Sequence, residues 1–167
     1  DEHPYLAVSP FNLVPSCSIC HVKKGRVSAR GNIPILNPYF DHIDGEWPRA
    51  VVQMDDGLPA AHYELSPQPS WSASLRKKVE EHFCRLELAE RYCVKAGNVL
   101  SNFPSSLSSH GKLTKEDVLD IFNERYQSEK NCERRDWAIA LYHNLAENEE
   151  YAGWALDKAE AMRASLE

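Results

Sequence analysis

The sequence predicts an α+β protein, in which a small N-terminal module with a β-hairpin is followed by a mainly helical domain. Two observations support this fold class. Residues 47–54 and 60–65 have strand character and flank Asp55-Asp56-Gly57, a turn sequence typical of hairpins. Beyond residue 70, apolar residues recur at spacings of three and four, which is the pattern of amphipathic helices.

The segment Ser66-Pro67-Gln68-Pro69-Ser70 is the clearest boundary in the chain, because closely spaced prolines and serines interrupt both helices and strands. We therefore place one domain at residues 1–66 and a helical bundle domain at residues 71–167. The length of 167 residues, with 43% hydrophobic and 26% charged residues, is enough for a sizeable core.

One long helix is predicted from Trp71 to about Ser101, because apolar residues from Leu75 to Val99 follow one face of a helix. Cys84 and Cys93 lie beside that face and are interpreted as packing residues. A polar linker is expected from Asn102 to Lys112.

Thr114 with Asp117 resembles a capping box and predicts the start of the next helix. Two further helices are expected at about 133–146 and 148–162. The four helices are predicted to pack as a bundle, which could support the N-terminal module, form an oligomer or dock a partner.

The N-terminal module contains the chemistry-bearing motif. Cys17 and Cys20 form a Cys-x-x-Cys, whose spacing lets two thiolates on one turn reach the same zinc ion. His21 follows at once, and a short helix is expected from Ser18. The pair is half of a four-ligand site; an oxidised turn and a redox pair are the alternatives.

The charge distribution is uneven, although the net charge is −6. Between residues 14 and 34, Lys23, Lys24, Arg26 and Arg30 occur without any acid, whereas residues 71–167 carry 17 acids against 14 Lys and Arg. A local basic patch is sufficient for binding nucleic acid. A solvated loop is the alternative interpretation.

The stretch Asn12-Leu-Val-Pro-Ser-Cys-Ser-Ile-Cys-His-Val-Lys-Lys-Gly25, with the later Asn37-Pro-Tyr-Phe-Asp41, resembles His-Asn-His (HNH) endonucleases of the ββα-metal type. The similar branch carries a four-cysteine zinc element and includes nucleases that accompany an ATPase in phage-defence systems of the Septu type and in some retrons. The resemblance implies a zinc-stapled ββα-metal nuclease module and a bacterial anti-phage function.

The resemblance also implies roles for individual residues. Asn12 would orient the general-base histidine, and His21 would be a ligand of the catalytic divalent cation, Mg²⁺ or Mn²⁺. Cys17 and Cys20 would share a structural Zn²⁺ with a second Cys-x-x-Cys upstream. Lys23, Lys24, Arg26 and Arg30 would contact DNA.

The sequence departs from the family pattern at its start. The Asp-His pair that supplies the general base should lie further upstream of Asn12 than this chain extends, and Asp1-Glu2-His3 lies too close to be that pair. We therefore expect the module of residues 1–66 to be truncated at its N-terminus. Asp41 and His42 are further candidates, either behind the metal ligands or facing DNA.

Three functions compete. The first is a metal-dependent endonuclease that hydrolyses DNA phosphodiester bonds, with a possible ATPase partner. The second is a catalytically incomplete, zinc-stabilised module that binds DNA or protein. The third is a helical interaction subunit. Five scattered cysteines favour a reducing cytoplasm, and neither a membrane-spanning apolar run nor a secretory signal occurs in the sequence.

Overall fold

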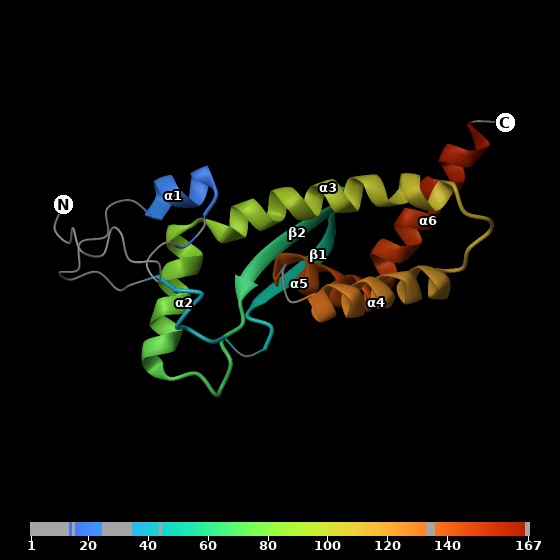
Figure 1. The fold of residues 1–167 in the computed structure, drawn as a ribbon. Coiled ribbons are helices and arrows are strands. Elements are labelled where there is room, and N and C mark those ends of the chain that lie inside the picture. The colour runs from blue at the N-terminus through green and yellow to red at the C-terminus, as the bar shows by residue number, and fades with distance from the viewer. Residues whose placement is uncertain (1–13, 15, 25–34, 44, 133–135, 166–167) are drawn as a thin grey trace. The chain divides into compact units, whose positions relative to one another are not determined.

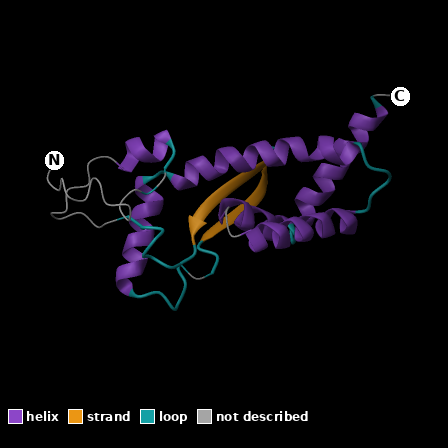
Figure 2. Ribbon diagram, viewed as in Figure 1, coloured by secondary structure: helices purple, strands orange, loops and turns teal. Residues whose placement is uncertain are grey.

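A computed structural model describes residues 14, 16–24, 35–43, 45–132 and 136–165 (Figure 1). Helices predominate, and the described residues form one two-stranded sheet, so the α+β class is confirmed (Figure 2). The elements are α1 (Ser18–Lys24), β1 (Pro48–Asp55), β2 (Leu58–Leu65), α2 (Ala73–Arg85), α3 (Leu88–Ser108), α4 (Lys115–Cys132), α5 (Asp136–Leu145) and α6 (Glu149–Ala164).

The described residues divide into two compact units. Unit 1 combines the chain up to Gly45 with Pro67–Leu88, and unit 2 combines Glu46–Ser66 with the chain from Ala89 onward. The predicted boundary after residue 66 coincides with one of the three points at which the chain passes between the units, and the other two lie at Glu46 and Ala89. The hairpin belongs with the helices of unit 2 and not with the N-terminal motif.

The hairpin itself forms as predicted. Strands β1 and β2 pair antiparallel, with Pro48 opposite Leu65 and Asp55 opposite Leu58. The two residues between the strands, Asp56 and Gly57, have φ values of 49° and 77°. A type I′ turn requires positive φ at both positions, which is why Asp-Gly is such a strong hairpin signal.

The packing of unit 2 explains why the hairpin joins the helices. One face of the sheet, which includes Ala50, Val52 and Tyr63, is buried, and β1 packs against α5. The main chain of Val52 is also bonded on its outer edge: its N–H donates to Asn144 Oδ1 at 3.0 Å, and its carbonyl accepts from Asn148 Nδ2 at 2.9 Å. Two helical side chains thus satisfy an edge that a lone hairpin would leave open.

The long helix predicted over 71–101 is wrong, because α2 and α3 are separate helices that break at Leu86 and Glu87. Glu87 has a φ of 50°, and the N–H groups of Leu86 and Glu87 bond to carbonyls of the preceding turn. Leu86 and Leu88, on either side of Glu87, are both buried. No glycine or proline marks this break in the sequence.

The predicted linker from Asn102 to Lys112 is also wrong over its first half, because α3 continues to Ser108 through Pro104. A proline inside a helix has no N–H to donate to the carbonyl four residues earlier, which here is Leu100. Tyr151 Oη of α6 donates to that carbonyl at 2.9 Å instead. The hydroxyl of Tyr151 thereby compensates for the hydrogen bond that Pro104 cannot make.

The remaining helices follow the prediction with small shifts of their ends. The capping box at the start of α4 is confirmed: Thr114 N donates to Asp117 Oδ2 at 2.7 Å, and Asp117 N donates to Thr114 Oγ1 at 3.2 Å. Aromatic rings of α3, α4 and α6, namely Phe103, Phe122 and Tyr151, pack together in the core. In the described part of the chain, no helix has both the length and the apolar character needed to cross a bilayer.

Unit 1 is organised around α2. Ser72 caps this helix, because its Oγ accepts the N–H of Leu75 at 3.1 Å. Val79 and Phe83 of α2 are buried, as are Trp71, Leu86 and Leu88 beside it in the sequence. This small core accompanies α1 and the turn at residues 37–41, which contain the residues singled out by the sequence.

Candidate functional site

The cysteine pair lies at the start of α1. Cys17 precedes the helix, and its Sγ accepts the main-chain N–H of Cys20 at 3.5 Å, while its carbonyl accepts the N–H of His21 at 2.9 Å. These two bonds fold the chain around Cys17 into the first turn of α1. Cys17 is exposed, and Cys20 is half-buried.

His21 is exposed and follows Cys20 directly in the helix. Successive residues of an α-helix differ in direction by about 100°, so Cys20 and His21 point to different sides of α1. This geometry suits His21 to a cation other than the one held by the cysteines. Among the residues that the structure describes, no three His, Cys, Asp or Glu side chains gather in a metal-binding group.

The basic residues near this motif are placed only in part. Lys23 forms an ion pair with Glu87, at the junction of α2 and α3. Both side chains are well exposed, and exposed pairs of this kind contribute little to stability. Lys24 is the last residue of α1. Asn12, Arg26 and Arg30 lie outside the residues that the structure describes.

Asp41 is held in a local network. Its Oδ1 accepts from Lys78 Nζ at 2.7 Å, and its Oδ2 accepts from Asn37 N at 2.8 Å. Partial burial opposes ionisation of Asp41, but the hydrogen bonds from Lys78 and Asn37 and the charge of Lys78 outweigh it and lower the pKa of the carboxyl. Asp41 therefore fixes the turn at residues 37–41 and ties it to α2. His42, the other candidate, is exposed.

The charge of the protein is divided unevenly between the units. By sequence, unit 1 has 8 Lys and Arg against 7 Asp and Glu, whereas unit 2 has 11 against 18. The net charge of −6 therefore comes from unit 2, and unit 1 is close to neutral with a slight positive excess. Unit 1 therefore lacks the acidic excess that unit 2 carries.

Sequence reasoning missed a polar cluster in unit 2, formed by Glu46, Tyr126, Lys130 and His143. Glu46 accepts from Tyr126 Oη at 2.6 Å and from His143 Nδ1 at 2.7 Å, and the Tyr126 and His143 rings stack with centroids 4.7 Å apart. The hydrogen bond to Glu46, with burial, raises the pKa of Tyr126. The partners are 80 and 97 residues apart, so no local pattern could have revealed the cluster.

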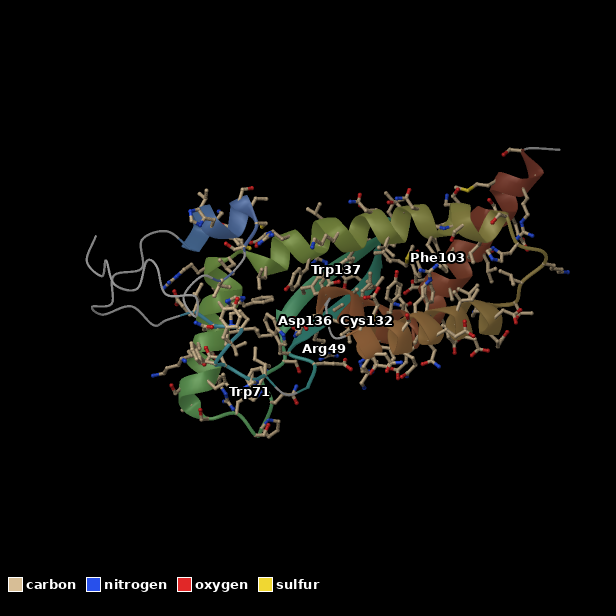
Figure 3. All side chains as sticks on the ribbon, in the orientation of Figure 1. Arg49, Trp71, Phe103, Cys132, Asp136 and Trp137 are labelled. Atoms are coloured by element: carbon tan, nitrogen blue, oxygen red, sulfur yellow. The ribbon has the colours of Figure 1, made fainter. Side chains whose placement is uncertain are left out.

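A second long-range feature of unit 2 involves Trp137, which is labelled in Figure 3. Its carbonyl accepts from Tyr63 Oη at 2.8 Å, and Lys95 Nζ lies 5.4 Å from the centroid of its ring. These contacts join α5 to β2 and to α3. They are packing contacts of the unit and include none of the residues that the sequence singled out as a site.

Comparison with known proteins adds one relative. A phage protein is similar to this chain. The similarity is to Protein ea31 of Escherichia phage lambda, with 26% identity over 167 residues, covering 90% of this chain and 56% of the phage protein. The chain thus spans about half the length of that relative. No family model matches the chain, and no solved structure matches it.

Proposed function

We propose that the protein is a metal-dependent HNH endonuclease that hydrolyses phosphodiester bonds of DNA, with a role in anti-phage defence. The observation that carries the proposal is the turn at the start of α1, where the Cys20 N–H is directed at Cys17 Sγ and His21 projects from the other side of the helix. This arrangement is suited to two separate cations, a structural one at the cysteines and a catalytic one at His21.

The residues present fit these two groups by their donor chemistry. Cys17 and Cys20 would hold half of a four-ligand structural zinc site. His21 would bind Mg²⁺ or Mn²⁺, which neutralises the charge that develops on the phosphate during hydrolysis. Asn12 would orient the general-base histidine. Because the core of unit 1 is small, the zinc would add to the stability of this unit.

The charge distribution supports DNA as the substrate. The acidic excess lies in unit 2, and the segment from Lys23 to Arg30 has four basic residues without an acid. Lys23, Lys24, Arg26 and Arg30 would contact phosphates. Because the ion pair of Lys23 with Glu87 is exposed, exchanging Glu87 for a phosphate costs little.

The test is cleavage of supercoiled plasmid by the full-length protein with Mg²⁺ or Mn²⁺, with a His21→Ala variant in parallel. We expect nicked and linear products from the wild type. The variant should cleave roughly a hundredfold more slowly at unchanged melting temperature, because it would no longer hold the cation that neutralises the charge developing on the phosphate. Equal cleavage by both proteins would remove His21 from the site.

The zinc is tested separately from activity. Metal analysis of the purified protein should find about one zinc per chain, and Cys17→Ser should lower both the zinc content and the melting temperature of unit 1. Cys84→Ser is the matched control, because Cys84 is an exposed lone cysteine of the same unit. If Cys17→Ser behaves like Cys84→Ser, the cysteine pair does not hold a structural metal.

The second candidate is a catalytically incomplete, zinc-stabilised module that binds DNA or protein. The same turn at Cys17 and Cys20 supports this candidate, because a binding module needs the zinc site but no general base. DNA binding without cleavage in Mg²⁺ or Mn²⁺ would support it over the endonuclease. A stable complex with another protein, such as an ATPase, without DNA affinity would support a helical interaction subunit instead.

A further inference from the structure

The polar cluster of unit 2 holds His143 of α5 with a defined proton. Nδ1 of this residue lies 2.7 Å from Glu46 Oε2. A carboxylate oxygen can only accept a hydrogen bond, so the hydrogen of the neutral ring is on Nδ1. The lone pair is then on Nε2, which can act as a base or a nucleophile. Among the residues that the structure describes, none bonds to Nε2.

Tyr126 of α4 fixes both the carboxylate and the imidazole ring. Its Oη donates to Glu46 Oε1 at 2.6 Å, and its ring stacks on the His143 ring with 20° between the two planes. The hydrogen bond to Glu46 raises the pKa of Tyr126, so the hydroxyl stays protonated and continues to donate. The His143 side chain is nevertheless 50% exposed, so a small molecule in solution can reach it.

A cation belongs to the same cluster. Lys130 Nζ donates to Tyr126 Oη at 3.2 Å and lies 3.9 Å from Glu46 Oε1. The Lys130 side chain is 55% exposed, and an ammonium group has three donors, so donors remain for an anion that approaches the cluster. The cluster thus combines an oriented nucleophile with a positive charge. Phosphoryl transfer to nitrogen requires both, one to attack phosphorus and the other to bind the phosphoryl oxygens.

We propose that His143 is a phosphoryl-acceptor residue, which is phosphorylated at Nε2 by donors whose phosphoryl group is bound to nitrogen. The Nε2 lone pair forms the new N–P bond while the N–P bond of the donor breaks. The donor amine, protonated in the reactant, leaves as the neutral amine, and the positive charge passes to the imidazole ring. Glu46 stabilises that charge through the Nδ1–H, and Lys130 binds the phosphoryl oxygens. The inference concerns unit 2 and is independent of the nuclease proposal.

The exposure of the cluster favours this reaction over the other uses of an oriented imidazole. A general base acts in a site that binds its substrate and excludes water, whereas half of the His143 side chain is in solvent. A metal ion would need further ligands, and no three His, Cys, Asp or Glu side chains gather for one in the described part of the chain. A phosphoryl acceptor needs only access for its donor.

The probe is potassium phosphoramidate, the smallest donor of this class, added to the native full chain at neutral pH. Intact mass should show the addition of one phosphoryl group, and peptide mapping should place it on His143. His110 is the matched control, because it is an exposed residue of the same unit whose Nδ1 bonds to the Ser106 carbonyl at 2.8 Å and not to a carboxylate. We expect His143 to react about tenfold faster than His110.

Variants test the roles of the two charged neighbours. Glu46→Gln can still accept from Nδ1 but has no charge to stabilise the phosphorylated ring, so it should slow phosphorylation of His143 about tenfold. Lys130→Ala should slow it by a similar factor, and Lys130→Arg should restore the rate because it keeps the charge. The rate at His110 should not change in any of these variants, and their melting temperatures are measured alongside.

Site mapping in the wild type decides the proposal even where a variant fails to fold. Faster phosphorylation of His143 than of His110 in the native protein, with equal rates after unfolding in urea, supports it. An unmodified His143, or one that reacts no faster than His110, overturns it. Wild-type rates in folded Glu46→Gln and Lys130→Ala would also overturn it, because the cluster would then contribute nothing to the reaction. None of these outcomes depends on whether the protein cleaves plasmid DNA.

Discussion

His82 makes the stability of unit 1 sensitive to acid. This residue lies in the last turn of α2, and burial lowers its pKa from 6.5 to about 4. The unfolded chain therefore takes up a proton at a higher pH than the folded one. The stability that neutral His82 contributes is fully present above pH 6.5 and is lost as the pH falls toward 4, by about 3 kcal/mol in total.

The assay is urea unfolding of wild type and His82→Gln at about pH 7 and about pH 4, followed by circular dichroism and tryptophan fluorescence. Glutamine never becomes charged, so the variant should lose about 3 kcal/mol less between the two pH values. His62→Gln, at an exposed hairpin position, is the control and should lose as much as the wild type. Equal losses for wild type and His82→Gln would refute the assignment.

Three further predictions concern unit 2, each read from urea unfolding at neutral pH. Gly57→Ala should cost about 1 kcal/mol, because Gly57 has a φ of 77°, and an unchanged midpoint would contradict the turn assignment. Thr114→Ala should cost about 1 kcal/mol by removing the α4 cap, with Ser the restoring substitution. Tyr151→Phe should cost about 1–3 kcal/mol, because it strands the Leu100 carbonyl beside Pro104; no loss would mean that water replaces the hydroxyl.

The parts of the fold that were predicted correctly are those decided within a few residues. The Asp56-Gly57 turn follows from backbone sterics, and the Thr114 cap follows from a reciprocal bond between residues three apart. The turn at Cys17 is of the same kind, because its bonds join residues three and four apart. Turns and caps of this kind can be predicted from a single sequence, because the residues that form them are only a few positions apart.

The errors share one cause, which is that distant residues decided the outcome. Ser101, Asn102 and Ser106 are residue types that are common in linkers, but here their side chains donate to carbonyls of α3 itself. Phe103 and Leu107, in the same stretch, are buried. The break at Glu87 puts a non-glycine residue at positive φ, which no propensity favours. The residues on either side of it, Leu86 and Leu88, are buried.

The candidate site shows the same division. The sequence identified Cys17, Cys20 and His21 by spacing, but it could not show that Asp41 is bonded to Lys78, 37 residues away, and is therefore occupied in fixing a turn. Nor could it show that Tyr39 and Phe40 are exposed on that turn, since consecutive aromatic residues are more often buried. Exposure is a tertiary property and has no local signature.

The order of the two units along the chain limits how they can be separated. The chain passes from unit 1 to unit 2 at Glu46, returns at Pro67 and passes again at Ala89. Glu46 is fixed at the first crossing by Tyr126 and His143, so the chain is anchored to α4 and α5 two residues before β1 begins. A fragment ending at residue 66 would keep the hairpin but lose α5, and it would expose the face that includes Ala50 and Tyr63. The nuclease proposal must therefore be tested on the whole chain, because a fragment cut at the apparent linker would fail for reasons of folding.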